Sequence, residues 1–371
     1  MEELSALGYV AWDSGADVSQ QGVTWIDPER VAPGFNIYTN EGTEVYLTNL
    51  DGERVHTWNV PAEKKWCELG ELLDDGKLAV VCTTRSLTIL DWDSNVLLDV
   101  KDNIHHDVAV LPDDSGYFVP VWRKKRYKGR KVRFDSVMRL SSTGEVVDEW
   151  STFEALEELQ ALHPPLPLDV RRPRETVAKN EKEALKAADS RESKFLGFDY
   201  YHLNSVEILP ETPLGQQDSR FRAGNLLVCL RNVDLIVVLD QDDHSVTWSW
   251  GTDTLDLPHM PTMLPNGNIL IFDNGKYRKF SRVLEIEPAS GEIVWQYEGD
   301  PPESFFSKWR GSAQRLSNGN TLICESERGY VFEVTPEGEK VWEFWNPDLK
   351  GDQRKRIYRF MRVDAAQLPR R

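Results

Sequence analysis

Three histidines and one arginine stand beside strands in three copies of a repeated pattern, and together they could transfer an anionic group. His106, His202 and His259 each stand at the start of an apolar strand pattern, and Arg231 follows another such strand in the phrase "CLRN". A neutral imidazole can act as a nucleophile or carry a proton near pH 7. A guanidinium binds the oxygens of sulfate or phosphate groups and keeps its charge at any working pH.

Each histidine taken alone has a structural explanation, because an isolated histidine in a strand is more often a hydrogen-bonded packing residue than a catalytic one. We assign His56, His163 and His244 to structure, since they stand beside a tryptophan, before two prolines and in an acidic turn. His105 precedes His106, and in a strand it is expected to point to the opposite face. Function is therefore favoured only where residues from several repeats converge.

A repeated phrase supplies the elements that would position these residues. The stretch "LPHMPTMLPNGNILIFDNG" is echoed by "WRGSAQRLSNGNTLICESERG", and the turns Asn266-Gly267 and Asn318-Gly319 lie about 52 residues apart. Each phrase has the pattern of a strand, a tight turn and an apolar strand, and each is followed by a second hairpin. Four strands in a repeat of this length form one blade of a β-propeller.

Weaker copies of the phrase begin near residues 67, 105 and 201, which gives five blade openings in all. The stretch from Glu44 to Trp58 is an outer hairpin without an inner one, and Arg356 to Asp364 is a single strand. Pairing the two chain ends in one sheet supplies a sixth blade and closes the ring. We therefore predict an all-β protein, a six-bladed β-propeller that forms a single domain over residues 1–371.

A helical and proline-rich insertion interrupts the propeller pattern at about residues 151–196. The phrase "EALEELQAL" and the charged segment from Glu175 onward have helical character, and "HPPLPLDVRRPR" separates them. We expect an excursion between the second and third blades, which serves either as a solvated decoration or as a lid over one face.

Charge and composition exclude some classes of function. The net charge of −17 argues against a nucleic-acid partner. One strongly basic stretch, from Arg123 to Lys131, is expected to be a long exposed hairpin, with docking to a polyanion or a membrane surface as the alternative. No apolar run is long enough to span a membrane, and no signal peptide is recognised.

The four cysteines are expected to be buried thiols. Cys82, Cys229 and Cys324 fall in the second strands of their blades, and equivalent positions of non-adjacent blades are too far apart for a disulfide. Cys67 begins a strand in the first blade, and its pairing is left open.

The innermost strands of a propeller converge on the central axis, so their register predicts which side chains meet there. Alignment of the turns puts His106, Asn204, His259 and Gly311 at one level, with His202 two residues before Asn204. Arg231 lies near the far end of a neighbouring strand. We therefore predict a functional site in the channel.

Several phrases in a fixed order carry a family resemblance. "HLNS" at His202, "CLRN" around Arg231, "LPNGNILIFDNG" after His259 and "GSAQRLSNGNTLICES" resemble the bacterial arylsulfotransferase family. The resemblance covers nearly the whole chain apart from the insertion. It implies a six-bladed propeller that moves a sulfuryl group from a phenolic sulfate ester to a phenol, without a cofactor or a nucleotide sulfate donor. It also implies that His259 is transiently sulfated, accompanied by His106, His202 and Arg231.

The partners implied by the resemblance are small molecules, an aryl sulfate donor and a phenolic acceptor. Trp309, Phe306 and Tyr358 lie near the predicted channel and are expected either to stack on aryl rings or to pack in the core, with Asn204 as a further substrate contact. The leaving phenolate needs a proton, which His106 or His202 would donate if its pKa lies near neutral.

Departures from the family leave some properties open. Well-known members carry an N-terminal β-domain and an export signal, and neither is recognised here. The oligomeric state therefore does not transfer, and a periplasmic or extracellular location is an expectation from the resemblance alone. Two alternatives remain: a noncatalytic propeller that binds an anionic ligand or a protein, and a metal-binding propeller based on the three histidines. Arg231 argues against the metal, because its charge repels a cation.

Overall fold

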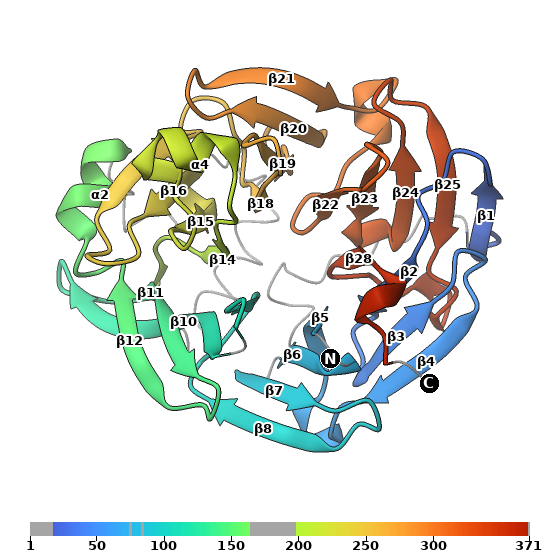
Figure 1. Cartoon of the computed structure of the whole chain (residues 1–371), viewed down its shortest axis with the longest axis horizontal. Coiled ribbons are helices and arrows are strands. Elements are labelled where there is room, and N and C mark those ends of the chain that lie inside the picture. The colour runs from blue at the N-terminus through green and yellow to red at the C-terminus, as the bar shows by residue number, and fades with distance from the viewer. Residues whose placement is uncertain (1–17, 74–75, 83–84, 114, 164–197, 370–371) are drawn as a thin grey trace, which may run out of the picture.

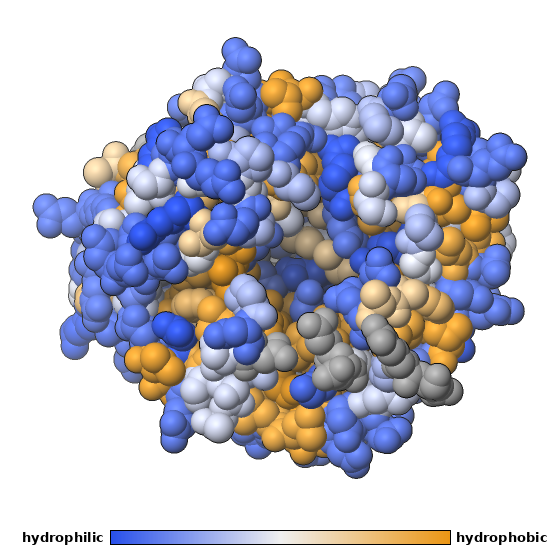
Figure 2. Space-filling view, in the orientation of Figure 1, coloured by the Kyte–Doolittle hydropathy of each residue, from blue (hydrophilic) through white to orange (hydrophobic). Residues whose placement is uncertain are grey.

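Six antiparallel sheets stand in a ring, each with its innermost strand nearest the centre (Figure 1). The computed structural model describes residues 18–73, 76–82, 85–113, 115–163 and 198–369. Seen from the same side, the molecular surface is largely hydrophilic and is hollowed at the centre of the ring (Figure 2). The six-bladed β-propeller that the repeats predicted is confirmed.

Blades 1 to 5 follow one another along the chain, and each runs from its inner strand to its outer strand. Blade 1 contains β5 (Cys67–Leu72), β6 (Leu78–Cys82), β7 (Ser86–Leu90) and β8 (Val96–Lys101). Blade 2 contains β9 (Ala109–Val110), β10 (Gly116–Tyr127), β11 (Arg130–Ser141) and β12 (Val146–Ser151). Blade 3 contains β14 (Leu203–Ile208), β15 (Leu226–Leu230), β16 (Leu235–Leu239) and β17 (Val246–Trp250).

The last two consecutive blades lie on the other side of the ring (Figure 1). Blade 4 contains β18 (His259–Met263), β19 (Ile269–Asp273), β20 (Arg282–Glu287) and β21 (Glu292–Tyr297). Blade 5 contains β22 (Ser312–Arg315), β23 (Thr321–Glu325), β24 (Tyr330–Val334) and β25 (Lys340–Trp345). A small hairpin of β26 (Leu349–Lys350) and β27 (Gln353–Arg354) follows blade 5.

Blade 6 joins the two ends of the described chain, as the sequence predicted. Its innermost strand is β28 (Phe360–Val363), followed outward by β2 (Phe35–Thr39), β3 (Glu44–Thr48) and β4 (Arg54–Asn59). Two details differ from the prediction. The N-terminal part contributes three strands rather than two, and the C-terminal strand begins at Phe360 rather than at Arg356. In addition, β1 (Gly22–Ile26) pairs with the outer strand of blade 5 as a fifth strand.

The middle strands of each blade are continuous apolar runs because neighbouring blades cover both of their faces. Every residue of β6, β15 and β19 is buried, whereas the outer strand β8 is half-buried or exposed throughout. Between blades 3 and 4, for example, Cys229 and Ile236 belong to the same apolar cluster as Ile271 and Leu284. These interblade layers hold the ring together and fix where the inner strands begin.

The predicted turn glycines have the backbone that a tight turn requires. Gly267 and Gly319 have φ angles of 91° and 90°. Side chains of L-residues rarely adopt this conformation, so glycine is the residue that permits the turn. The two phrases that revealed the repeat therefore form equivalent hairpins in blades 4 and 5.

Blade 2 carries the long basic hairpin and the start of the insertion. β10 and β11 have 12 residues each and turn at Lys128 and Gly129. The helix predicted in "EALEELQAL" is confirmed as α2 (Leu156–Leu162), while residues 164–197 of the predicted insertion lie outside the described residues. β13 (Phe198–Asp199) then pairs in parallel with β11, and a short helix, α4 (Pro213–Gln217), follows β14.

The four cysteines are free and buried, as expected. Cys67 lies directly opposite Cys82 in the β5–β6 pair, and the two Sγ atoms are 2.7 Å apart. Among the described residues, no helix is both long and apolar enough to cross a bilayer.

Candidate active site

The predicted histidines lie where the backbone enters the innermost strands. His106 and His202 stand shortly before β9 and β14, and His259 is the first residue of β18. The φ angles of His106, His202 and Met260 are 67°, 53° and 47°. A side chain in this left-handed conformation costs about 1–3 kcal/mol and persists only where surrounding contacts hold it. Such strain at three positions beside one channel is characteristic of functional sites.

A hydrogen bond fixes the orientation of the His259 imidazole. Its Nδ1 lies 2.6 Å from Oδ1 of Asn274, a fully buried residue just after β19. The amide nitrogen of Asn274 donates to the carbonyls of Ser307 (2.6 Å) and Arg310 (2.8 Å), so its oxygen must face the imidazole. Because an amide oxygen only accepts, Nδ1 of His259 carries the hydrogen. The lone pair of the neutral ring is therefore on Nε2.

Electrostatics keep this imidazole neutral. Burial lowers the pKa of His259 well below its usual value, and the charge of Arg231 lowers it further. A protonated ring would have no lone pair with which to attack. His259 therefore has both the tautomer and the protonation state of a nucleophile.

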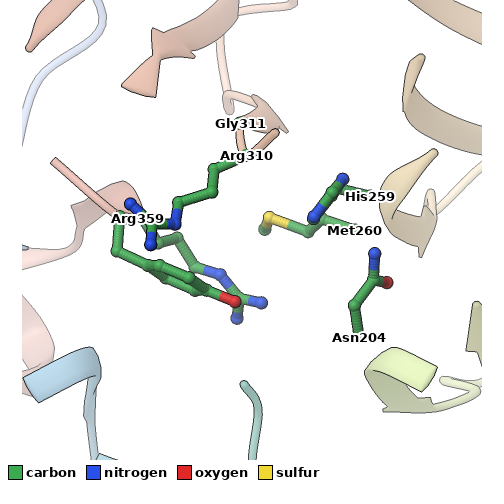
Figure 3. Close-up of a pocket in the computed structure, with 7 residues that line it drawn as sticks. Asn204, His259, Met260, Arg310, Gly311 and Arg359 are labelled. Atoms are coloured by element: carbon green, nitrogen blue, oxygen red, sulfur yellow. The ribbon is translucent and has the colours of Figure 1, made fainter. Parts of the chain in front are cut away.

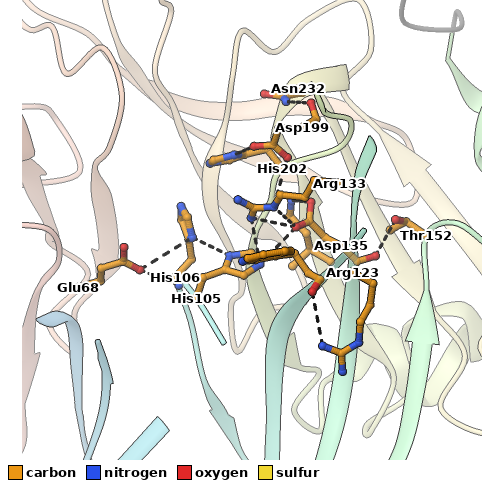
Figure 4. A network of polar contacts seen from close by, with 12 residues as sticks. Glu68, His105, His106, Arg123, Arg133, Asp135, Thr152, Asp199, His202 and Asn232 are labelled. Carbon is orange, nitrogen blue, oxygen red and sulfur yellow. Dashed lines mark hydrogen bonds and ion pairs between the residues drawn. The ribbon is translucent and has the colours of Figure 1, made fainter. Parts of the chain in front are cut away.

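His202 forms a pair with a carboxylate that sequence reasoning missed. Its Nδ1 lies 2.6 Å from Oδ2 of Asp199 in β13 (Figure 4). Burial lowers the pKa of His202, while the charge of Asp199 and their hydrogen bond oppose that shift. Burial alone would raise the pKa of Asp199, but the charges of Arg133 and His202 hold it well below its usual value. The pair is therefore an ionised carboxylate beside an imidazole, a typical proton-handling arrangement.

His106 belongs to the same polar network. Its ring lies 4.9 Å from the His202 ring, edge to face, and its backbone N–H donates to Oε2 of Glu68 at 2.9 Å. The expectation that His105 points away from His106 is wrong, because their Nδ1 atoms are 2.7 Å apart. The reason is that both residues lie before β9 and outside a regular strand, and His106 has a left-handed backbone, so their side chains do not alternate between faces.

The expectation of near-neutral pKa values also needs correction. Burial, followed by the charges of His105 and His202, lowers the pKa of His106 well below its usual value. Burial and the charge of Arg133 lower the pKa of His105 to about 4. Of the three predicted histidines, His202 has the closer carboxylate, with Asp199 at 2.6 Å from its Nδ1, whereas Glu68 lies 4.0 Å from Nδ1 of His106.

Arg231 places a charge beside these rings. It begins a short turn after β15, is only 2% exposed, and its Nη1 donates to the Asn232 side chain at 3.0 Å. Its guanidinium lies 5.4 Å from the centre of the Trp309 ring, and Nζ of Lys276 lies 3.9 Å from the same centre. Two buried cations thus meet one indole, a setting suited to an anionic aryl group.

A small cavity of about 10 Å³ adjoins His259 (Figure 3). Its walls also include Asn204 and Tyr358, which were predicted as substrate contacts, together with Met260, Arg310, Gly311 and Arg359. Asn204 donates to the carbonyl of Pro258 at 2.9 Å. The volume matches about one water molecule, so an aryl ring requires the mouth of the channel.

The remaining predicted contacts lie apart from this cavity. Trp309 borders Arg231, as described above. The backbone N–H of Phe306 donates to Glu325 at 3.2 Å, and its ring does not line the cavity. The role of Phe306 as a substrate contact remains a prediction.

A larger cavity of about 380 Å³ shares Met260 and Arg359 with the small one. Arg359 forms an ion pair with Asp107 at 2.8 Å. Burial raises the pKa of Glu71 to about 7 and that of Glu207 to about 8. This second space is therefore rich in carboxyl groups, in contrast to the cationic surroundings of His259.

The described residues contain no group of three or more histidine, cysteine, aspartate or glutamate side chains arranged to hold a metal ion. The three predicted histidines are instead engaged with Asn274, Asp199 and His105.

The sequence profile of the arylsulfotransferase (ASST) family matches residues 72–347, which is most of the chain and includes all but one of the predicted site residues, Tyr358. The chain belongs to the arylsulfotransferase family. No curated protein matches the sequence.

Solved structures resemble this arylsulfotransferase-family chain in fold alone. A protein of unknown function from Bacteroides caccae is 14% identical with a TM-score of 0.55, over 89% of this chain and 98% of that one. The β-propeller domain of Myceliophteria thermophila Cps50 (Swd1) is 10% identical with a TM-score of 0.49, over 91% of this chain and 88% of that one.

The structure adds two residues to the candidate site that sequence reasoning missed, Asn274 and Asp199. Asn274 stands in the phrase "FDNG" at the end of the second strand of its repeat, and that position was the available signal. Asp199 had no such signal, because it follows the insertion and belongs to no repeat.

Proposed function

We propose that this protein is a sulfotransferase that moves a sulfuryl group from an aryl sulfate ester to a phenolic acceptor through a transient sulfohistidine at His259. The observation that carries the proposal is the hydrogen bond from His259 Nδ1 to Asn274. It leaves the Nε2 lone pair available in a ring whose pKa is lowered by burial and by Arg231. Membership of the arylsulfotransferase family supports the reaction class.

In the first half-reaction, Nε2 of His259 attacks the sulfur atom and the bond between sulfur and the aryl oxygen breaks. The electron pair leaves on the phenolate oxygen. Arg231 binds the sulfuryl oxygens, where negative charge is spread in the transition state. Its guanidinium is planar and can contact two of these oxygens at once.

His202 carries the proton in this proposal. In the free protein its pKa is lowered, chiefly by burial. A bound aryl sulfate adds a negative charge beside the ring and favours the imidazolium that Asp199 already supports. His202 then gives its Nε2 proton to the leaving phenolate. It takes a proton from the acceptor phenol as that oxygen attacks sulfur and the N–S bond breaks, which restores His259.

His106 is assigned a positioning role. Its Nδ1 is engaged with His105, and its ring lies against His202 and 6.0 Å from Tyr358. A neutral imidazole in this place can hydrogen-bond a sulfuryl oxygen. It adds no positive charge, which would disfavour the protonation of His202.

A noncatalytic propeller that binds an anion is the second candidate, because a cavity of about 10 Å³ beside His259 holds a small group but no ring. A transfer assay separates the two. Purified protein is mixed with 4-nitrophenyl sulfate and phenol, and both nitrophenol and phenyl sulfate are measured. We expect both products from the wild type and from the control His244→Ala, and neither from His259→Ala. Binding of the ester without any transfer would support the noncatalytic candidate.

A further inference from the structure

A group of cations at the blade 1–blade 2 side of the channel is not used by the proposed mechanism. Arg85 stands in the turn between β6 and β7, and Trp122 and Lys124 lie in β10. The Arg85 guanidinium lies 5.8 Å from the centre of the Trp122 ring, and Nζ of Lys124 lies 5.5 Å from it. Arg133 meets the same ring at 5.6 Å. Three like charges thus converge on one indole.

Arg133 and Arg85 differ in whether a carboxylate forms an ion pair with them. Arg133 is paired with Asp135 at 3.0 Å and lies 3.6 Å from Asp199. Arg85 forms no ion pair with any residue in the described ranges. Burial and the charge of Arg133 lower the pKa of Arg85 more than the charges of Glu68, Asp199 and Asp135 raise it, so its environment disfavours the charge that it carries. An unmatched, half-buried guanidinium is stabilised when an anion binds.

The indole contributes a hydrogen-bond donor at the same place. The Nε1–H of Trp122 is buried and has no acceptor among the residues that the structure describes. A buried N–H without a partner costs about 1–3 kcal/mol, which an oxygen acceptor would recover. Guanidinium, ammonium and indole N–H are all donors, and none of them accepts. The group therefore suits an oxyanion and not a cation.

The adjoining face of the long hairpin extends this positive region outward. Lys124 lies opposite Arg133, and Arg126 lies directly opposite Lys131 in the β10–β11 pair. Arg126 and Lys131 are exposed, and neither forms an ion pair within the described part of the chain. Like charges directly opposite each other destabilise a strand pair. This face stands out in a chain of net charge −17 and would attract anions toward the mouth.

The group also lies close to the proposed reaction centre. Nη2 of Arg133 is 3.2 Å from Nε2 of His105, and His105 contacts His106 (Figure 4). Arg133 therefore connects the Trp122 ring to the histidines.

We propose that Arg85, Trp122 and Lys124 form an anion subsite that binds a second anionic group, a carboxylate or a further sulfate, on the aryl sulfate donor. The inference rests on the proposed function, because it assigns the donor's reacting sulfuryl group to His259. The natural donor is then a dianion rather than a simple phenyl sulfate. The second negative charge of the donor fixes the orientation of its aryl ring at the mouth of the channel.

The test compares 4-carboxyphenyl sulfate with its neutral isostere 4-carbamoylphenyl sulfate. Each is titrated into the protein by calorimetry and each is used as a donor to phenol. We expect the wild type to bind the carboxylate more tightly, and Arg85→Gln to reduce that preference by about tenfold, as for the loss of one charged hydrogen bond. Trp122→Phe should reduce it as well. Added salt should weaken it in the wild type.

Arg139→Gln is the matched control, because Arg139 is an exposed cation at the far end of β11. It should retain the preference. Equal affinity of the wild type for the two esters, or the same loss in Arg139→Gln as in Arg85→Gln, would overturn the subsite. Tighter binding of the carboxylate that depends on Arg85, but without any sulfuryl transfer, would keep the subsite and reject the proposed reaction.

Discussion

Replacement of Asn274 by alanine should slow sulfuryl transfer to His259 without touching any atom that reacts. The variant removes the only acceptor that Nδ1 of His259 has among the described residues, a 2.6 Å hydrogen bond at a fully buried amide. The loss of such a bond in a buried site costs about 1–3 kcal/mol. Since 1.4 kcal/mol is a factor of ten, the reactive tautomer and the first-step rate should fall by about 5- to 150-fold.

The assay is a single-turnover measurement of nitrophenol release from 4-nitrophenyl sulfate. The nitrogen chemical shifts of His259 report its tautomer independently, because hydrogen moves from Nδ1 to Nε2 when the acceptor is lost. A merely structural role for Asn274 would lower the melting temperature and leave that tautomer unchanged.

Asn225→Ala is the control for packing. Asn225 is equally buried, and its amide also donates to two backbone carbonyls, those of Ser219 and Arg220. It lies away from the histidines, so its replacement should cost stability and leave the rate of the folded protein intact. An Asn274→Ala variant whose first step is as fast as that of Asn225→Ala would refute the tautomer argument.

Three further predictions concern the proton carrier, the second cavity and the cavity wall. Asp199→Asn should lower the pKa of His202, because Asp199 raises it by charge and hydrogen bond. The fall of kcat/KM at alkaline pH should then move to lower pH. A pH profile that does not move would show that His202 takes no part in proton transfer. Burial raises the pKa of Glu207 from 4.5 to about 8, so the folded protein holds a proton that the unfolded chain releases, and stability falls as pH rises between these values. Glu207→Gln should therefore raise the melting temperature at pH 9 but not at pH 4, and equal shifts at both would contradict the assigned pKa. Gly311→Ala should lower the free energy of unfolding in urea by about 1–3 kcal/mol. The reason is that φ of Gly311 is 153° and a Cβ there would lie 2.3 Å from the Phe272 ring. A variant as stable as the wild type would show that the Phe272 ring can move aside freely.

Much of the fold could be predicted because its determinants are local and repeated. The Asn-Gly turns at residues 266–267 and 318–319 and the apolar runs beside them specify hairpins by turn chemistry and burial alone. Closure of the ring followed from two incomplete patterns at the chain ends. β1 was missed because it completes no pattern of its own and is held by pairing with β25, a contact between distant parts of the chain.

The site was predictable in its residue types and not in its geometry. Register alone brought His259 and Asn204 to one cavity wall. The backbone turns at His106 and His202 break strand alternation, so the contact between His105 and His106 could not be read from spacing. The lowered pKa values arise from burial in the assembled ring, which no short stretch of sequence contains. Asp199 stands three residues before His202, but their contact depends on the turn between β13 and β14, which spacing alone does not specify.

The central claim is that His259 carries the sulfuryl group during transfer. The most direct test is to measure the mass of the protein after it has reacted with a donor. The protein is mixed briefly with 4-nitrophenyl sulfate without acceptor, quenched at alkaline pH, where an N–S bond survives, and analysed intact and as peptides. We predict the gain of one sulfuryl group, located on His259, its absence in His259→Ala, and its loss when phenol is added before quenching. The account would be contradicted by a wild-type protein that transfers the sulfuryl group to phenol while its own mass never changes. A protein that carries the group on another residue would contradict it as well.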